Sequence, residues 1–273
     1  MSAPEPKERL SAMDALDLGR TLLEKLKKGT LTSEEAADMM VAGANVKGVY
    51  DNAPSGWLTP LVLAVKNGQT DIIKELINPE AGDRAASLND KDNAQESIWK
   101  YAFPAGKKDI WEFLFENGAS TADALQTATR QNNADAINFV LDKGCDINTC
   151  FLNDGSTSLC TAVRYSAMDA LETLLERGAD VNIASQISGD TPLMFAVWSG
   201  KIEMIRPLLE HGAKTDTINR AGMSITNHIP NREAFQVIKD FEREQTIKSF
   251  QSAADKGTTK PRRIHRPKKE VKP

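Results

Sequence analysis

The chain has 273 residues, of which 40% are hydrophobic and 26% are charged, and its formal net charge is −4. No apolar run approaches the length of about 18 residues that a membrane span needs, and the first eight residues, MSAPEPKE, lack the apolar core of a secretory signal. We therefore expect neither a transmembrane helix nor a cleaved leader, and we expect a cytoplasmic location. The spacing of Cys145, Cys150 and Cys160 matches no common zinc site, so we expect reduced thiols, no metal and no cofactor.

The N-terminal part predicts an arm followed by a pair of helices. Residues 1–15 begin with polar, proline-bearing sequence, which is typical of a flexible arm. Helices are predicted over residues 16–29 and 32–44, and the second opens with TSEE, a hydroxyl followed by acids in the first turn. This pair is more polar than those that follow, as expected of a capping unit at the end of a repeat array.

A unit of two short helices recurs along the middle of the chain. In its clearest copy, Thr191 and Pro192 predict a capped helix start, and apolar residues spaced by three and four predict one buried face on each helix. Gly212 suits the left-handed conformation that often ends a helix. Two short helices cannot bury their apolar faces alone, so the copies are predicted to stack. The five copies occupy residues 59–77, 97–120, 124–148, 156–182 and 189–216.

These copies resemble the ankyrin repeat, whose pattern is T-P-L-x-x-A…G…I-V-x-x-L-L-x-x-G-A-x-x-N. The resemblance implies an all-α, helix-turn-helix solenoid of about five to six repeats with divergent caps, over residues 16–244. Only residues 59–61 and 191–193 keep the full opening triplet, and the histidine that usually follows is replaced in every copy. We expect this loss to weaken the hydrogen bonding between adjacent repeats. The replacing residues are Val62, Lys100, Gln126, Cys160 and Met194.

Two segments depart from the repeat. Residues 78–96 are the longest interruption and are too polar to join the core, so they are interpreted as a functional loop or a floppy one, and the second is favoured. Near the other end, residues 223–229 make a poor first helix, whereas residues 234–241 carry the apolar spacing of a second helix. A C-terminal capping unit is therefore predicted.

The composition changes at residue 245. Residues 245–273 contain nine Lys/Arg and two Asp/Glu, a net charge of +7, which leaves −11 for residues 1–244. This composition predicts a disordered tail with three interpretations: a site for nucleic acid or acidic lipid, an address for the nucleus or for export as a secreted effector, or a solubilising linker. The address and linker interpretations are favoured, because no aromatic residues alternate with the bases to stack on nucleotides. The densest cluster of bases consists of Lys260, Arg262, Arg263, Arg266, Lys268 and Lys269.

The sequence carries no pattern that predicts catalysis. It has no Gly-rich phosphate loop, no paired-histidine helix motif and no nucleophile elbow. The open groove of a solenoid also disfavours the dry pocket that general acid–base chemistry needs. We therefore expect a non-enzymatic, monomeric adaptor for another protein. The alternatives are a targeted or secreted effector, and an accessory subunit that presents a substrate to an enzyme or inhibits it.

The resemblance also implies where a partner protein docks. This is the concave face formed by the first helices of the copies and by the tips of the loops between copies, which are called fingers. Adjacent copies offer Arg164, Tyr165 and Trp198 there, which are residue types that dominate binding hot spots. The alternative is that the two aromatic side chains only cover neighbouring repeats. The residues predicted for this face are Lys66, Asn67, Arg130, Gln131, Asn153, Asp154, Arg164, Tyr165, Ser188, Asp190, Trp198 and Ser199.

Overall fold

A computed structural model describes most of the chain between residues 14 and 255. Within the described residues the regular structure is helical, apart from one isolated antiparallel bridge between Ile218 and Ser224. The predictions for Asn153, Asp154 and the basic cluster at 260–269 lie outside the described residues. The described ranges are 14–46, 59–78, 86–92, 96–151, 155–225 and 232–255, without the side chains of 253–255.

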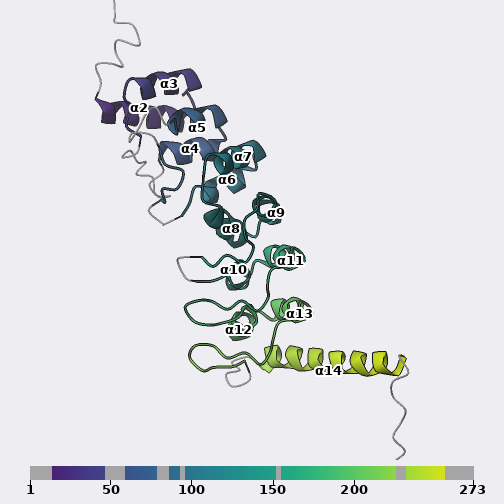
Figure 1. Ribbon diagram of the computed structural model, residues 1–273. Coiled ribbons are helices and arrows are strands. Elements are labelled where there is room, and N and C mark those ends of the chain that lie inside the picture. The colour runs from purple at the N-terminus through teal and green to yellow at the C-terminus, as the bar shows by residue number, and fades with distance from the viewer. Residues whose placement is uncertain are drawn as a thin grey trace, which may run out of the picture.

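The described helices form two layers of an elongated stack, with each inner helix followed by an outer one (Figure 1). The inner layer consists of α2 (Ala15–Lys28), α4 (Pro60–Asn67), α6 (Trp99–Ala105), α8 (Thr121–Arg130), α10 (Ser158–Tyr165) and α12 (Pro192–Trp198). The outer layer consists of α3 (Ser33–Val41), α5 (Thr70–Leu76), α7 (Lys108–Glu116), α9 (Ala134–Asp142), α11 (Met168–Glu176), α13 (Ile202–Glu210) and α14 (Arg232–Asp255). This arrangement confirms the predicted all-α solenoid.

Local sequence fixes where the inner helices begin. The hydroxyls of Thr59, Thr157 and Thr191 each accept a hydrogen bond from the backbone N–H three residues later. This bond satisfies one of the amides that lack a partner in the first turn of a helix. In α3 the predicted capping box is present, because Thr32 and Glu35 each accept a hydrogen bond from the other's backbone amide.

Equivalent apolar residues recur every 34 residues in the last three copies of the unit, and their side chains share one continuous core. Leu125, Leu159 and Leu193 of successive inner helices are almost fully buried, and Ile137 and Ile205 are buried at equivalent positions of the outer helices. Each such side chain contributes about 1.5–3 kcal/mol when it leaves water. Because each repeat buries its apolar stripe against the next, the core runs along the length of the stack.

The repeat made by α6 and α7 is filled by aromatic side chains. Trp99 stacks on Phe103 at 5.1 Å between ring centroids, and Phe103 meets Trp111 edge-on at 5.2 Å. Both buried indoles donate to backbone carbonyls, that of Trp99 to Ser120 at 2.9 Å and that of Trp111 to Ala102 at 2.8 Å. Both tryptophans therefore occupy core positions without leaving an unsatisfied N–H group, as such burial requires.

The interruption at residues 78–96 is tied to the core where the structure describes it. Leu88 is buried, and Asn89 donates to the carbonyl of Gly118 at 3.1 Å and accepts from the amide of Ser120 at 2.8 Å. The expectation of a floppy segment is therefore wrong for residues 86–92. The high average polarity of residues 78–96 did not reveal that Leu88 is buried and that Asn89 is hydrogen-bonded to the next repeat.

The final helix extends past the predicted boundary at residue 244. Ala234 and Ile238 are buried, which agrees with the predicted second helix of a capping unit, but α14 continues to Asp255. Residues 232–255 contain neither Gly nor Pro, and a helix that is already nucleated adds further turns at little cost. The segment 245–255 is therefore helical, and its low apolar content was not evidence of disorder.

Candidate protein-binding site

The turn that ends each inner helix sets the direction of the predicted site residues. A left-handed residue occupies the same position in five repeats, at Gly68, Gly106, Asn132, Ser166 and Gly200. This conformation closes the inner helix and starts the turn toward the outer helix. The residues two positions earlier therefore occupy equivalent places at the ends of the inner helices. Among them are the predicted site residues Lys66, Arg130, Arg164 and Trp198.

Arg130 is held in place by Glu96, which lies 34 residues earlier. Its two terminal nitrogens donate to the two carboxylate oxygens of Glu96 at 3.0 and 2.9 Å, a bidentate pair. Burial lowers the pKa of Arg130, but the hydrogen bonds and the charge of Glu96 outweigh it and raise the pKa above its usual value. The guanidinium therefore stays charged in a fixed position.

Tyr165 lies over this guanidinium from the next repeat. The Arg130 Cζ atom is 5.1 Å from the centroid of the Tyr165 ring, within the range of a cation–π contact. Even so, 49% of Tyr165 is exposed. The Arg130 guanidinium thus orients the ring, while about half of the Tyr165 surface stays exposed to solvent.

The next step along the face repeats the arrangement with different residues. The Arg164 Cζ atom is 5.3 Å from the centroid of the Phe195 ring, and its guanidinium donates to the Ser156 hydroxyl at 3.0 Å. Trp198 is partly buried and packs against the core, so the covering role predicted as the alternative applies to part of this side chain. We call Arg130, Arg164, Tyr165, Phe195 and Trp198 the aromatic–arginine band.

Three other predicted residues hold the structure together. Asp190 is buried and accepts a hydrogen bond from the Asn219 side chain at 2.7 Å, so it offers no surface to a partner. Ser188 accepts from the amide of Asp190 at 3.2 Å, and the side chain of Gln131 donates to the carbonyl of Lys100 at 3.0 Å. The prediction that Asp190 faces a partner is therefore wrong, because a short polar side chain next to a turn bonds to the neighbouring finger.

The remaining predicted residues are exposed but do not all lie near the band. Ser199 follows Trp198 directly, whereas Lys66 and Asn67 end α4, two repeats before α8. Phe195 and Glu96 were not predicted. Phe195 lies among core residues of its helix, and Glu96 lies in the interruption, so neither gave a separate signal in the sequence.

The fingers that follow α9, α11 and α13 are joined to one another by backbone hydrogen bonds. The amide of Gln186 donates to the carbonyl of Gly155 at 2.7 Å, and the amide of Arg220 donates to the carbonyl of Ser188 at 3.0 Å. A Cβ atom at Gly189 would lie 2.7 Å from the backbone nitrogen of Arg220. Glycine therefore permits a close approach that stacks one finger on the next.

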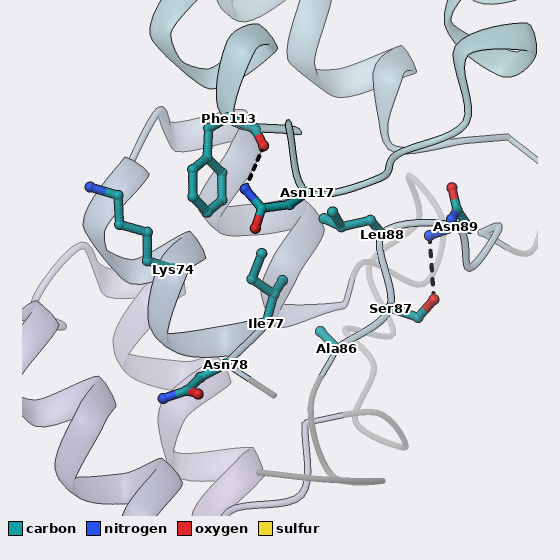
Figure 2. A pocket seen from close by; sticks show the side chains of 9 residues that line it. All are labelled: Lys74, Ile77, Asn78, Ala86, Ser87, Leu88, Asn89, Phe113 and Asn117. Carbon is teal, nitrogen blue, oxygen red and sulfur yellow. Dashed lines mark hydrogen bonds between the residues drawn. The ribbon is translucent and has the colours of Figure 1, made fainter. Parts of the chain in front are cut away.

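A separate pocket of about 530 Å³ lies between α5 and α7 (Figure 2). The Asn117 side chain donates to the carbonyl of Phe113 at 2.8 Å at its wall, and Lys74 of α5 and Ile77, which follows α5, also line it. No predicted site residue lines this pocket, which lies among outer helices. In the part of the chain that the structure describes, no group of three or more His, Cys, Asp or Glu residues is placed to hold a metal ion.

Comparisons with known proteins agree with this geometry. A family model described as ankyrin repeats (3 copies) matches residues 125–219, and one described as an ankyrin repeat matches residues 57–93. The unmatched stretch between them includes the aromatic-filled repeat of α6 and α7. A search of curated proteins finds no match.

Solved structures show the same fold. The ankyrin repeat domain of Bcl-3, described as a unique member of the IkappaB protein family, matches with a TM-score of 0.61 and 19% identity, over 84% of this chain and 99% of that one. The human ASB11 ankyrin repeat domain matches with a TM-score of 0.57 and 24% identity, over 79% of this chain and 95% of that one. The chain therefore has the fold of ankyrin repeat domains, and family models of the ankyrin repeat match it over residues 57–93 and 125–219.

Proposed function

We propose that this chain is a non-enzymatic adaptor that binds a protein partner on its concave face, through the aromatic–arginine band. Ankyrin repeats are generally protein–protein interaction modules. The observation that supports the band in particular is the state of Tyr165, which is half exposed while its ring rests on a guanidinium that Glu96 fixes.

Preordering of these side chains favours binding. A partner that docks on a free, rotating tyrosine or arginine must immobilise it, at a cost of about 0.5–1.5 kcal/mol for each side chain. Here Arg130 is fixed by two hydrogen bonds, and Tyr165 is oriented by Arg130. Much of that cost is therefore met when the chain folds.

The chemistry of the band suggests the chemistry of the partner. Tyr165, Phe195 and Trp198 offer apolar area. Arg164, an exposed residue, directly precedes Tyr165, and its guanidinium lies over the Phe195 ring. A carboxylate or a backbone carbonyl of the partner is the acceptor that suits this guanidinium. The proposed partner therefore presents a segment in which an acidic or carbonyl group adjoins an apolar side chain.

Site-specific photo-crosslinking tests this proposal. A benzophenone amino acid replaces Tyr165 in the full chain, and in a matched control it replaces Glu172, which is exposed on α11 in the outer layer. After irradiation in an extract of the source organism, we expect position 165 to give a discrete adduct that position 172 does not. The change Arg164→Glu should weaken that adduct. Crosslinking to a partner from position 172 alone would contradict the proposal.

A further inference from the structure

The last helix is much longer than its position in the stack requires. The other outer helices have 7–9 residues, whereas α14 has 24. Its first half packs on α13, and Glu244 forms an ion pair with Arg206 of α13 at 2.7 Å. The C-terminal part of this helix projects past the outer layer (Figure 1). We call residues 245–255 the C-terminal overhang.

Two large apolar side chains of the overhang are left in water. Ile247 is 56% exposed and Phe250 is 71% exposed. They are three residues apart and therefore share one face of the helix. At 3.6 residues per turn this face is nearly opposite the one that Ala234 and Ile238 bury against the solenoid. The pair thus faces away from the rest of the molecule, where the end of a repeat array is normally polar.

A basic sequence follows this apolar pair. Beside Ile247, an open groove of about 420 Å³ is lined by Lys239 and Arg243, which form ion pairs with Glu242 at 2.8 Å and with Asp240 at 3.5 Å. The sequence that follows the overhang, residues 256–273, has eight Lys/Arg and one Glu, while residues 1–244 carry −11. An exposed apolar pair on a helix therefore adjoins the one strongly basic segment of an acidic chain.

We propose that the C-terminal overhang binds the surface of a membrane that contains acidic phospholipids. Ile247 and Phe250 enter the layer between the headgroups, and the net positive charge of the sequence that follows favours acidic over neutral lipid. Each signal alone gives weak attachment, and two together give a useful one. The helix lies on the membrane, since no described helix has the length and apolar content to cross one.

The acidic lipid surface accounts for both observations, whereas other occupants account for one. A nucleic acid would attract the bases but would leave Ile247 and Phe250 in water. A second copy would cover the two apolar side chains, but it would bring together two bodies of the same charge. Two side chains per molecule also fall well below the total of about 1,200–2,000 Å² that a stable protein interface buries.

Vesicle flotation with the full chain tests this inference. The vesicles are phosphatidylcholine alone or with about 30% phosphatidylserine, at about 0.1 M salt. We compare the wild type with Ile247→Ser/Phe250→Ser and with a chain that ends at Asp255. The matched control is Val41→Ser/Ile218→Ser, which removes two other exposed apolar side chains, 87% and 67% exposed. All these side chains are on the surface, so circular dichroism should show unchanged helix content.

We expect the wild type and the control to bind the phosphatidylserine vesicles equally. The overhang variant and the truncated chain should each bind roughly tenfold more weakly, and phosphatidylcholine alone should bind weakly. The inference is overturned if the wild type does not float with the acidic vesicles, or if the overhang variant binds as well as the wild type. It is also overturned if the overhang mutations abolish a dimer in solution but leave vesicle binding unchanged.

Discussion

The side chain of Asn132 caps a helix of the following repeat, because its oxygen accepts a hydrogen bond from the amide of Ala170 at 2.9 Å. Its nitrogen donates to the Asp169 carboxylate at 2.8 Å. Asn132 itself has a left-handed φ of 54° at the end of α8, and α11 has no capping side chain of its own. One residue therefore ends a helix in one repeat and begins a helix in the next. Such bonds join repeats that lack the usual histidine.

Replacement of Asn132 should separate these two roles. The change Asn132→Gly keeps the left-handed turn but removes the cap, so the free energy of unfolding should fall by about 1 kcal/mol. The change Asn132→Ala removes the cap and adds the cost of a left-handed alanine, for a total of about 2 kcal/mol. Urea denaturation followed by circular dichroism measures both. Equal losses for the two variants would show that the left-handed turn carries no cost.

Two glycines with similar dihedral angles should respond differently to alanine. Gly189 (φ 76°) lies against the backbone of Arg220, whereas Gly212 (φ 87°) has nothing within 4 Å of its missing Cβ. The change Gly212→Ala should cost only the left-handed strain, about 1 kcal/mol. The change Gly189→Ala should cost clearly more, because the finger of the next repeat must move. Urea denaturation of both variants checks the order, and a smaller loss at position 189 would refute the close approach.

Acid should lower the stability of the first helix pair, α2 and α3, by protonating Glu35. The hydrogen bond from the Lys25 side chain, and then that from the backbone of Thr32, hold the pKa of Glu35 below its ordinary value of 4.5. A carboxylate with a lowered pKa stabilises the fold above pH 4.5, and that contribution is lost as the pH falls through the folded-state pKa. The wild type should therefore be more stable than Glu35→Gln at pH 7. The difference should shrink below pH 4.5, and a constant difference in urea denaturation across this range would count against the assignment.

Sequence periodicity was sufficient to predict the repeat architecture. Residues such as Leu125, Leu159 and Leu193 recur at one interval and are buried for the same reason, so a single pattern predicts many contacts. The limits of α14 were not predictable in this way. The residues after Glu244 form helix without burying a stripe, and an apolar pattern reports only buried faces.

The candidate site was predictable only in part. The repeat phase placed Arg130, Arg164 and Trp198 at equivalent positions, since the helix-ending turn is common to the copies. It did not reveal that Glu96 orients Arg130, because that contact comes from an interruption outside the repeat pattern. Asp190 shows the opposite case. It was predicted as a site residue, but its side chain is buried and accepts a hydrogen bond from Asn219 of the next finger.

The most direct test of the proposed function is the affinity of the crosslinked partner, once purified, for the variant Tyr165→Ala/Trp198→Ala, measured by isothermal titration calorimetry. Truncation of hot-spot aromatics typically costs more than about 1 kcal/mol each, so binding should weaken more than tenfold. The control Glu172→Ala should bind as the wild type does. If the double variant keeps wild-type affinity, the aromatic–arginine band is not the binding surface and the proposal fails.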